Sequence, residues 1–451
     1  MSRLEPPWAW DLEAPYAIVV PVYDESYSTV YRLLGSIDSR ALAILVVNKS
    51  HTSPWTVAKS NERLLEELPK IYAHKNEHED MLFCSGRGLS PRLLIVDRTT
   101  EGKTIANGVG EARRIGCDLL FDLQTRGKIK SDWIHNTDAD SILPADYFTA
   151  AEAVFKDGRR SALCMRGVSG FTNDPEREEA VQIDSLSASF VSASLARTAA
   201  PWPITVSGCG LAVSHWAYHM SGGMQPYNAR EDGHLINTAG KLGLIHRVYG
   251  QRILTEARET SRPPAGYADT ISGIQRSIED FGHYPKTLSH PAAYAHTDAF
   301  FKTIEHCLLS RDHVSSACER ACVEAYGKWG FEMHVDKVRE AIDKLVGPID
   351  DMFRHMSPIE AYLQIHQAID LRGTLRVVTG FGRKLWPQVD WAEALRLSPW
   401  LKASDYSHDL GKALWVCSRD EAEACVGTFG PMAMAKKLFG ESTQGGTDGK
   451  K

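Results

Sequence analysis

Two aspartates separated by one residue, Asp138 and Asp140, are the side chains of this sequence best placed for chemistry. The apolar residues Trp133 and Ile134 predict a strand before them, and Pro144 after them is favoured in the first turn of a helix. In an open α/β sheet, ligands bind at such strand ends. Two crowded carboxylates repel each other unless a proton or cation relieves them, and Mg²⁺ or Mn²⁺ takes oxygen ligands and bridges to phosphates. The pair therefore predicts a metal and diphosphate site, although Asp is also common in turns and caps.

A second acidic pair, Glu231 and Asp232, opens a predicted helix after the flexible residues Gly222 and Gly223. Carboxylates in a first helical turn are favourable because they lie at the positive end of the helix dipole. That effect explains one acid more readily than two adjacent ones. The pair is therefore a second candidate for a functional role.

The elements that must position these acids follow from the hydrophobic pattern. Near-continuous apolar runs at residues 16–23, 43–48 and 92–97 predict strands buried on both faces of a parallel sheet, with helices between them. This alternation predicts right-handed crossovers and helices on both faces. Polar residues at the strand ends would share one edge of the sheet, either as ordinary turn residues or as a binding rim: Asp24, Glu25, Asn48 and Asp97.

The segment at residues 101–116 predicts a helix that is opened by a glycine and rich in small residues. Each glycine inside a helix costs about 1 kcal/mol relative to alanine, which is tolerable where something must approach the backbone closely. Lys103, Asn107 and Arg113 are candidates for contacts to a ligand's phosphates or base. Neither a P-loop nor a dinucleotide-binding fingerprint is present.

The pattern changes along the chain and predicts two structural units. Strands and helices continue to about residue 285, helices dominate residues 286–440, and residues 441–451 have the composition of a disordered tail. The charged segment at residues 73–80 predicts a mobile loop. We therefore expect an α/β catalytic domain at 1–285, a helical accessory region at 286–440 and a tail at 441–451.

Composition limits the function further. The 451 residues are 43% hydrophobic and 24% charged, with a formal net charge of −6, which gives no reason to expect a nucleic-acid or anionic-membrane surface. No apolar run is long enough to span a bilayer, and the N-terminus lacks the apolar core of a signal peptide. Nine scattered cysteines, an odd number in mostly apolar surroundings, are typical of reduced thiols, so we expect a cytoplasmic protein.

The order of these motifs resembles the family 2-like glycosyltransferases of the GT-A fold, of bacterial type. The resemblance covers roughly residues 15–270, and each motif is weak alone but informative in this order. The matching pieces are the first strand with its terminal acids at 19–25, the Gly-rich Ala-Arg helix at 108–116, the Asp-x-Asp motif at 137–140, the Glu-Asp motif at 230–232, and Thr-Ser-Arg at 260–262 before Gly266 and Tyr267.

The resemblance implies a GT-A-type, Rossmann-like, mostly parallel sheet with helices on both faces, followed by a mainly α-helical C-terminal region. It also implies a metal-dependent glycosyltransferase of hexosyltransferase type, which uses a UDP-, GDP- or dTDP-sugar and an unidentified acceptor hydroxyl. Asp140 would bind Mn²⁺ or Mg²⁺ directly, and Asp138 would contact the metal or the ribose. Asp232 would be the general base of an inverting reaction, and Glu231 would orient either Asp232 or the acceptor.

The remaining roles implied by the resemblance concern the nucleotide-sugar. Asp24 and Asp97 would hold the base and ribose, and Lys103, Arg113 and Arg262 would contact the diphosphate or base. His215, His234 and His246 are candidates for a further metal ligand, although histidines are more often structural. The full set of expected nucleotide-sugar contacts is Pro21, Tyr23, Asp24, Glu25, Asn48, Asp97, Lys103, Asn107, Arg113, Asp138, Ala139 and Arg262.

Two features depart from the family pattern. The second strand usually ends in an aspartate, where this chain has Asn48, and the helical region after about residue 290 lies outside the common core. A sugar-nucleotide nucleotidyltransferase is an alternative, although it would normally carry a Gly-rich, Arg-containing loop after the first strand, where this chain has Tyr23 to Ser26. A non-catalytic nucleotide-sugar-binding or scaffold protein on the same fold is the other alternative.

Overall fold

The structure is a computed structural model. It describes residues 6–7, 10–86, 90–100, 102–154, 161–202, 208–258, 267–282, 288–310, 314–327, 336–337, 339–340, 342–344, 355–386, 388–398, 400–401, 409–425 and 427–439. The chain divides into two units, which we call the sheet unit (Met1–Phe171 and Val206–Glu256) and the helical unit (Thr172–Thr205 and Ala257–Lys451). The segment Thr172–Thr205 thus groups with the C-terminal helices, whereas the sequence placed it in the catalytic domain. The predicted tail lies outside the described residues.

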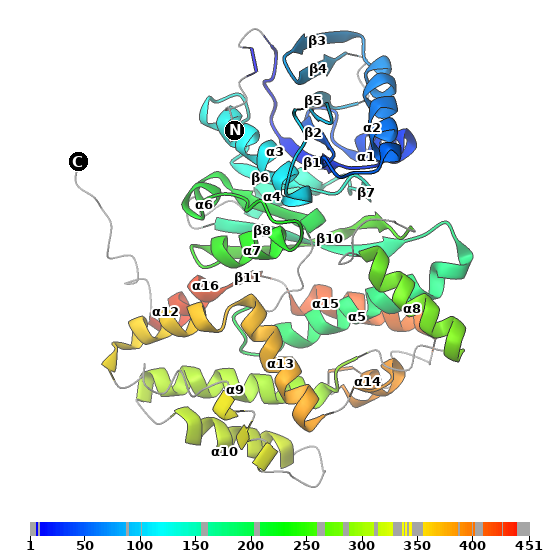
Figure 1. The fold of residues 1–451 in the computed structure, drawn as a ribbon. Coiled ribbons are helices and arrows are strands. Elements are labelled where there is room, and N and C mark those ends of the chain that lie inside the picture. Colours follow the sequence, from blue (N-terminus) through cyan, green and yellow to red (C-terminus); the bar gives the residue numbers. More distant parts are fainter. Residues whose placement is uncertain are drawn as a thin grey trace, which may run out of the picture. The chain divides into compact units, whose positions relative to one another are not determined.

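The sheet unit is built on one mixed sheet whose central strands are parallel (Figure 1). Strands β5, β2, β1 and β6 are parallel neighbours, and β9 lies antiparallel between β6 and β8, while β8 pairs in parallel with β10. The α/β fold class with a mostly parallel sheet is therefore confirmed. In sheet order the strands are β10 (Leu244–Glu256), β8 (Ser161–Phe171), β9 (Leu211–Ser214), β6 (Trp133–Asn136), β1 (Ala17–Val22), β2 (Leu42–Asn48), β5 (Arg92–Arg98), β4 (Met81–Ser85) and β3 (His74–His78).

Helices cover both faces of this sheet, as the buried strands require. Because side chains alternate along a strand, Ile18 and Val20 face one side, where they share a core with helices α1 and α2, and Val19 faces the other side. On that second side helix α3 packs so closely that a Cβ at Gly116 would lie 2.4 Å from Val19 Cγ1. The helices of this unit are α1 (Tyr27–Ser36), α2 (Trp55–Glu67), α3 (Gly108–Thr125), α4 (Tyr147–Val154), α6 (His215–Met220) and α7 (Glu231–Ala239).

One local prediction was wrong. Residues 73–80 contain strand β3 and the turn that joins it to β4 in a hairpin, rather than a mobile loop. All five residues of β3 are exposed and polar, because this edge strand has no buried face that would impose apolar alternation. Strand β10 is one long strand whose register against β8 shifts between Val248 and Ile253, beside Gly250, which has a φ of 146°.

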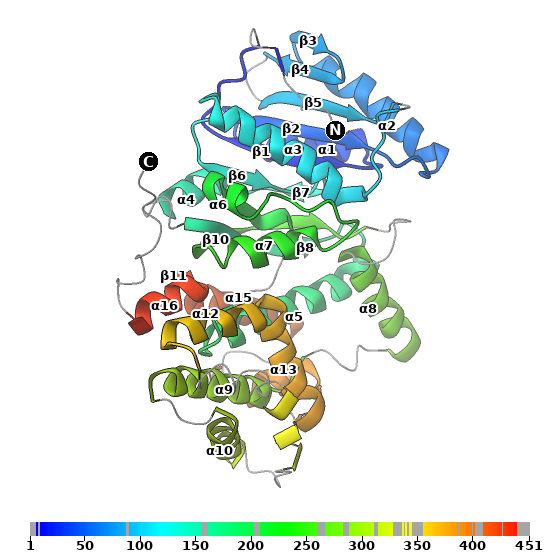
Figure 2. The same cartoon turned by 60° about the vertical axis from the view of Figure 1, so that its left-hand side comes forward.

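The helical unit has its own core, centred on Phe190, Tyr294, Phe300 and Phe381. Helix α5, which interrupts the sheet unit in sequence, lies beside α15 (Figures 1 and 2). The predominantly helical character predicted for the C-terminal region is confirmed. Its elements are α5 (Glu178–Ala196), α8 (Tyr267–Phe281), α9 (Pro291–Ser310), α10 (Val314–Gly327), α12 (Pro358–Ala368), α13 (Leu371–Leu385), α14 (Trp391–Leu397), α15 (Leu410–Ala424), β11 (Gly427–Phe429) and α16 (Pro431–Phe439).

All nine cysteines are buried free thiols, so Cys318 and Cys322 are core residues of the helical unit. Among the described helices, none combines the length and the apolar character that crossing a membrane requires.

Candidate active site

The loop that carries Asp138 and Asp140 is held between strands β1 and β10. The Thr137 amide donates to the Val19 carbonyl at 3.1 Å, and the Glu256 amide, at the end of β10, donates to the Asp140 carbonyl at 3.2 Å. Ser141 and Ile142 then form the short strand β7 against β10. These contacts fix the backbone on both sides of the two aspartates. Asp138 and Asp140 are half-buried and Ala139 is buried between them.

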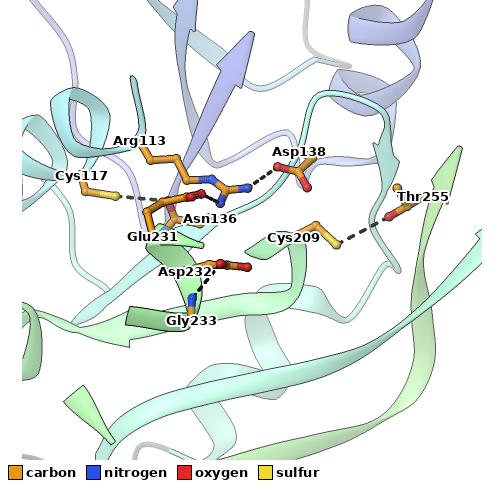
Figure 3. A network of polar contacts seen from close by, with 9 residues as sticks. All are labelled: Arg113, Cys117, Asn136, Asp138, Cys209, Glu231, Asp232, Gly233 and Thr255. Carbon is orange, nitrogen blue, oxygen red and sulfur yellow. Dashed lines mark hydrogen bonds and ion pairs between the residues drawn. The ribbon is translucent and has the colours of Figure 1, made fainter. Parts of the chain in front are cut away.

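A buried arginine on helix α3 joins the two acidic motifs (Figure 3). The Arg113 guanidinium donates one hydrogen bond from Nη2 to Asp138 and another from Nη1 to Glu231. The side chain of Arg113 is 6% exposed, whereas that of Asp138 is 37% exposed. A Cβ at Gly208 would lie 2.6 Å from Arg113 Nη1, so a glycine at this position leaves room for the guanidinium.

The second acidic pair begins helix α7, directly after a strained residue. Arg230 has a φ of 66°, an uncommon conformation for a residue with a side chain. Glu231 is 2% exposed, but the Asp232 side chain is half-buried, and its Oδ1 accepts a hydrogen bond from the Gly233 amide at 2.6 Å. The two adjacent acids therefore differ in their surroundings. Glu231 is a buried partner of Arg113, and Asp232 is accessible.

The neighbouring carboxylates explain why the buried Arg113 guanidinium keeps its positive charge. Burial alone lowers the pKa of Arg113, but Asp138, Glu231 and Asp232 together raise it above its usual value, so the guanidinium keeps its charge. Burial raises the pKa of Glu231, and Arg113 opposes that rise. One positive charge thus lies among three carboxylates, and this excess of negative charge favours a cation or a polar ligand with cationic character.

The residues present can hold a divalent ion only with help from other ligands. Within the described parts of the chain, no three His, Cys, Asp or Glu side chains are grouped so that they could hold a metal. Mg²⁺ commonly binds through one or two carboxylates together with water and substrate phosphates. The part-exposed carboxylate of Asp138, with Asp140 two residues on, fits that kind of site.

The three candidate histidines have local packing partners. The His215 ring stacks on Phe121 at 4.1 Å, and His246 Nε2 lies 2.8 Å from the hydroxyl of Ser161. The His234 and Tyr227 rings pack in a T-shaped arrangement with their centroids 5.6 Å apart. Each of these histidines therefore has a packing or hydrogen-bonding role of its own.

The polar rim at the ends of β1 and β2 is tied together by a residue that the sequence did not single out. Asn61 of α2 is fully buried; its Oδ1 accepts from the Asp24 amide at 3.2 Å, and its Nδ2 donates to the Asn48 carbonyl at 2.9 Å. Asn48 in turn donates from Nδ2 to the carbonyls of Val22 and Val46. An aspartate at 48 has no such donor, so the departure from the family pattern has a structural reason.

Other predicted contacts also have partners inside the chain. Asp97 accepts from the Thr99 amide and hydroxyl at 2.7 and 2.6 Å and from the Thr100 hydroxyl at 2.7 Å. The Tyr23 hydroxyl lies 3.3 Å from that of Ser53. Pro21 and Glu25 are buried, and Lys103 is half-buried. Arg262 and the motif at 260–262 lie outside the described residues.

The glycines of α3 permit a close approach by the chain itself. The Gly110 amide donates to the Tyr227 carbonyl at 3.1 Å, and a Cβ at Gly110 would lie 2.3 Å from that oxygen. The Asn107 amide and side chain both donate to the buried Glu111 carboxylate. The expectation that something approaches this backbone is thus met by the loop that leads into α7, which places Glu231 and Asp232 beside Arg113.

Comparison with known proteins adds little to this geometry. No protein-family model matches the sequence, and no curated protein matches it either. Among solved structures, S. aureus TarS 1–349 in complex with UDP is similar with a TM-score of 0.33 and 11% sequence identity, over 78% of this chain and 90% of that chain. A likeness of this size establishes neither a shared family nor a shared activity.

Proposed function

We propose that this protein is a glycosyltransferase that moves a sugar from a nucleotide-diphosphate sugar to an acceptor hydroxyl. One observation carries the proposal: the aspartate of the Asp-x-Asp motif and the glutamate of the Glu-Asp motif bind the same guanidinium, that of Arg113. These motifs are 93 residues apart in sequence, from Asp138 to Glu231, and the resemblance to family 2-like enzymes assigns them to the donor and the acceptor.

The donor side is the pair Asp138 and Asp140. Held there by the two carboxylates and by the donor's phosphate oxygens, Mn²⁺ or Mg²⁺ would supply positive charge for a departing diphosphate. The expected nucleotide contacts remain Pro21, Tyr23, Asp24, Glu25, Asn48, Asp97, Lys103, Asn107, Ala139 and Arg262. Arg113 is better explained as an internal partner of the two acids, because its guanidinium is buried and bonded to both.

The acceptor side is Asp232, which we assign as general base. A base must reach the acceptor hydroxyl, and the half-buried Asp232 meets this condition, whereas Glu231 is buried on Arg113. The acceptor oxygen forms a bond to the anomeric carbon while the bond from that carbon to the diphosphate breaks. The hydroxyl proton passes to Asp232, and the bonding electron pair leaves with the diphosphate. A single displacement of this kind inverts the anomeric configuration.

A thermal-shift screen with UDP-, GDP- and dTDP-sugars, each with and without Mn²⁺, tests the proposal. We expect one nucleotide class to raise the melting temperature in a Mn²⁺-dependent manner, since a ligand that binds only the folded state stabilises it. Asp140→Ala should abolish the Mn²⁺ dependence, and calorimetry with the selected nucleotide would check it. Binding that is unchanged in Asp140→Ala would remove the metal role, and no shift with any donor would contradict the proposal.

A further inference from the structure

The guanidinium of Arg113 is buried and bonded to an acid on each of two sides. Nη1 donates to Glu231 and Nη2 donates to Asp138, while Nε is buried without a hydrogen-bond partner in the part of the chain that the structure describes. The backbone at Gly208 closes on the guanidinium at a distance that leaves no room for a side chain there. Asp138, in contrast, is part-exposed. Its carboxylate binds the buried Arg113 guanidinium and is also accessible from outside.

We propose that Arg113 is an internal counter-ion that holds Asp138 in place and competes with a divalent cation for its carboxylate. Cation binding then depends on the arrival of the donor's diphosphate. This inference rests on the proposed function, because it concerns how that same site takes up its metal. Arg113 is a positioning residue here, since it acts through Asp138 and Glu231 and does not touch the substrate.

Electrostatic repulsion underlies this competition for Asp138. A divalent ion that binds Asp138 shares that carboxylate with the guanidinium, so the two positive charges repel, and this repulsion is stronger near a protein interior than in water. A diphosphate brings negative charge to the same place and offsets the repulsion. The cation is therefore bound weakly alone and firmly together with the nucleotide.

The second contact of Arg113 links this event to the acceptor side. Glu231 is buried and is the first residue of α7, and Asp232 follows it directly. When a cation takes over Asp138, the guanidinium keeps its bond to Glu231 and so keeps the start of α7 in place. The binding of the donor with its cation and the position of the general base thus both depend on the side chain of Arg113.

The test measures binding of Mn²⁺ alone, without nucleotide, from the free-ion signal in electron paramagnetic resonance. Because Arg113→Gln by itself leaves Glu231 buried without its partner, the comparison is Glu231→Gln against the double variant Arg113→Gln/Glu231→Gln. We expect the double variant to bind Mn²⁺ about tenfold more tightly, which corresponds to about 1.4 kcal/mol. Equal or weaker binding by the double variant would overturn the proposal, because a purely structural arginine can only loosen the site when it is removed.

Two further variants separate charge from general damage. Arg113→Lys keeps the positive charge and should keep the weak Mn²⁺ binding of the wild type; a gain as large as that of the double variant would overturn the counter-ion role. Arg166→Gln is the matched control, because Arg166 is also a buried arginine of the sheet unit but pairs with Asp146, and it should leave Mn²⁺ affinity unchanged. A tenfold gain in this control would also overturn the proposal.

The same titrations with saturating UDP, GDP or dTDP keep this inference distinct from the proposed function. If the wild type binds Mn²⁺ with a nucleotide and the double variant gains nothing without one, the inference fails and the function stands. If no protein binds Mn²⁺ under any condition, the inference fails together with the metal role, and the donor screen still decides the proposed function.

Discussion

Glu231 and Asp232 are neighbours in sequence with opposite surroundings, and this difference supports the separate roles that we propose for them. Glu231 is buried on Arg113, whereas Asp232 is half-buried and bonded to the Gly233 amide. We therefore expect Asp232→Asn to keep nucleotide-sugar affinity and to lower the rate of transfer by about 10²- to 10⁴-fold, the usual contribution of a general base. Calorimetry for the donor and product formation for transfer measure the two effects. Full turnover by Asp232→Asn would exclude it as the base.

His135 provides a prediction about pH. It lies fully buried in β6 against the rings of Tyr147 and Phe148, and burial lowers its pKa to about 3. The unfolded chain, with an ordinary pKa of about 6.5, binds a proton in the range where the folded protein does not, so the stability is present above pH 6.5 and is lost as the pH falls. Between pH 7 and pH 5 this residue should cost about 2 kcal/mol of the free energy of unfolding.

Urea unfolding of the wild type and of His135→Phe at both pH values isolates this effect, because the other histidines are common to both proteins. The variant should lose less stability than the wild type on acidification. Equal losses would show that His135 is not buried in its neutral form.

The residue-scale contacts could be predicted only in part. The types and order of Asp138, Asp140, Glu231 and Asp232 were evident from the sequence, and so was the presence of an arginine on the preceding helix. The pairing of Arg113 with both motifs was not, because it depends on the meeting of three distant segments. Asn61 was missed for the same reason: a polar residue on a helix carries no sign that it will be buried between two strand ends.

At the scale of single elements, the packing of helix α3 against its neighbours depends on its glycines. A methyl group at position 110 would lie 2.3 Å from the Tyr227 carbonyl, which is backbone and has little freedom to move. Gly110→Ala should therefore lower the free energy of unfolding by about 1–3 kcal/mol, the usual cost of overpacking, and displace the loop that leads to Glu231. Transfer activity should fall with it.

Gly35, at the end of α1, is the matched control in the same unit. A Cβ there has nothing within 4 Å, so Gly35→Ala should be neutral or stabilise the helix by up to about 1 kcal/mol. Denaturant unfolding of the two variants compares them directly. Similar effects at both positions would show that helix propensity, and not the approach of Tyr227, explains the glycine at 110.

The hydrophobic pattern of the sequence predicted buried strands better than exposed ones. Strands β1 and β2 are buried along their whole length, so their apolar runs predicted them well. Strand β3 was missed because an exposed edge strand carries no apolar side. The helix predicted from residue 101 begins at Gly108 instead, since Glu111 accepts hydrogen bonds from the amides of Ala106 and Asn107 and holds the preceding residues in a turn.

At the scale of the whole molecule, the important feature is that the sheet unit is discontinuous in sequence. Helix α5 lies between β8 and β9 along the chain, yet its side chains Leu186, Phe190 and Leu195 belong to the core of the helical unit. The expected catalytic domain at residues 1–285 would therefore carry α5 without α9 and α15, the helices against which it packs. Such a fragment exposes a row of apolar side chains that the complete chain buries.

We therefore expect a fragment of residues 1–285 to bind a hydrophobic dye such as ANS and to self-associate in size-exclusion chromatography. The matched control is the same fragment with Leu186→Gln, Phe190→Gln and Leu195→Gln, which removes the apolar row and leaves the sheet unit unchanged. This control should be monomeric and should bind the nucleotide-sugar selected in the donor screen, because every described residue that we assign to the site lies in the sheet unit. A monomeric, dye-silent unmodified fragment would show that α5 does not need the helical unit, and the domain boundary after residue 285 would then hold.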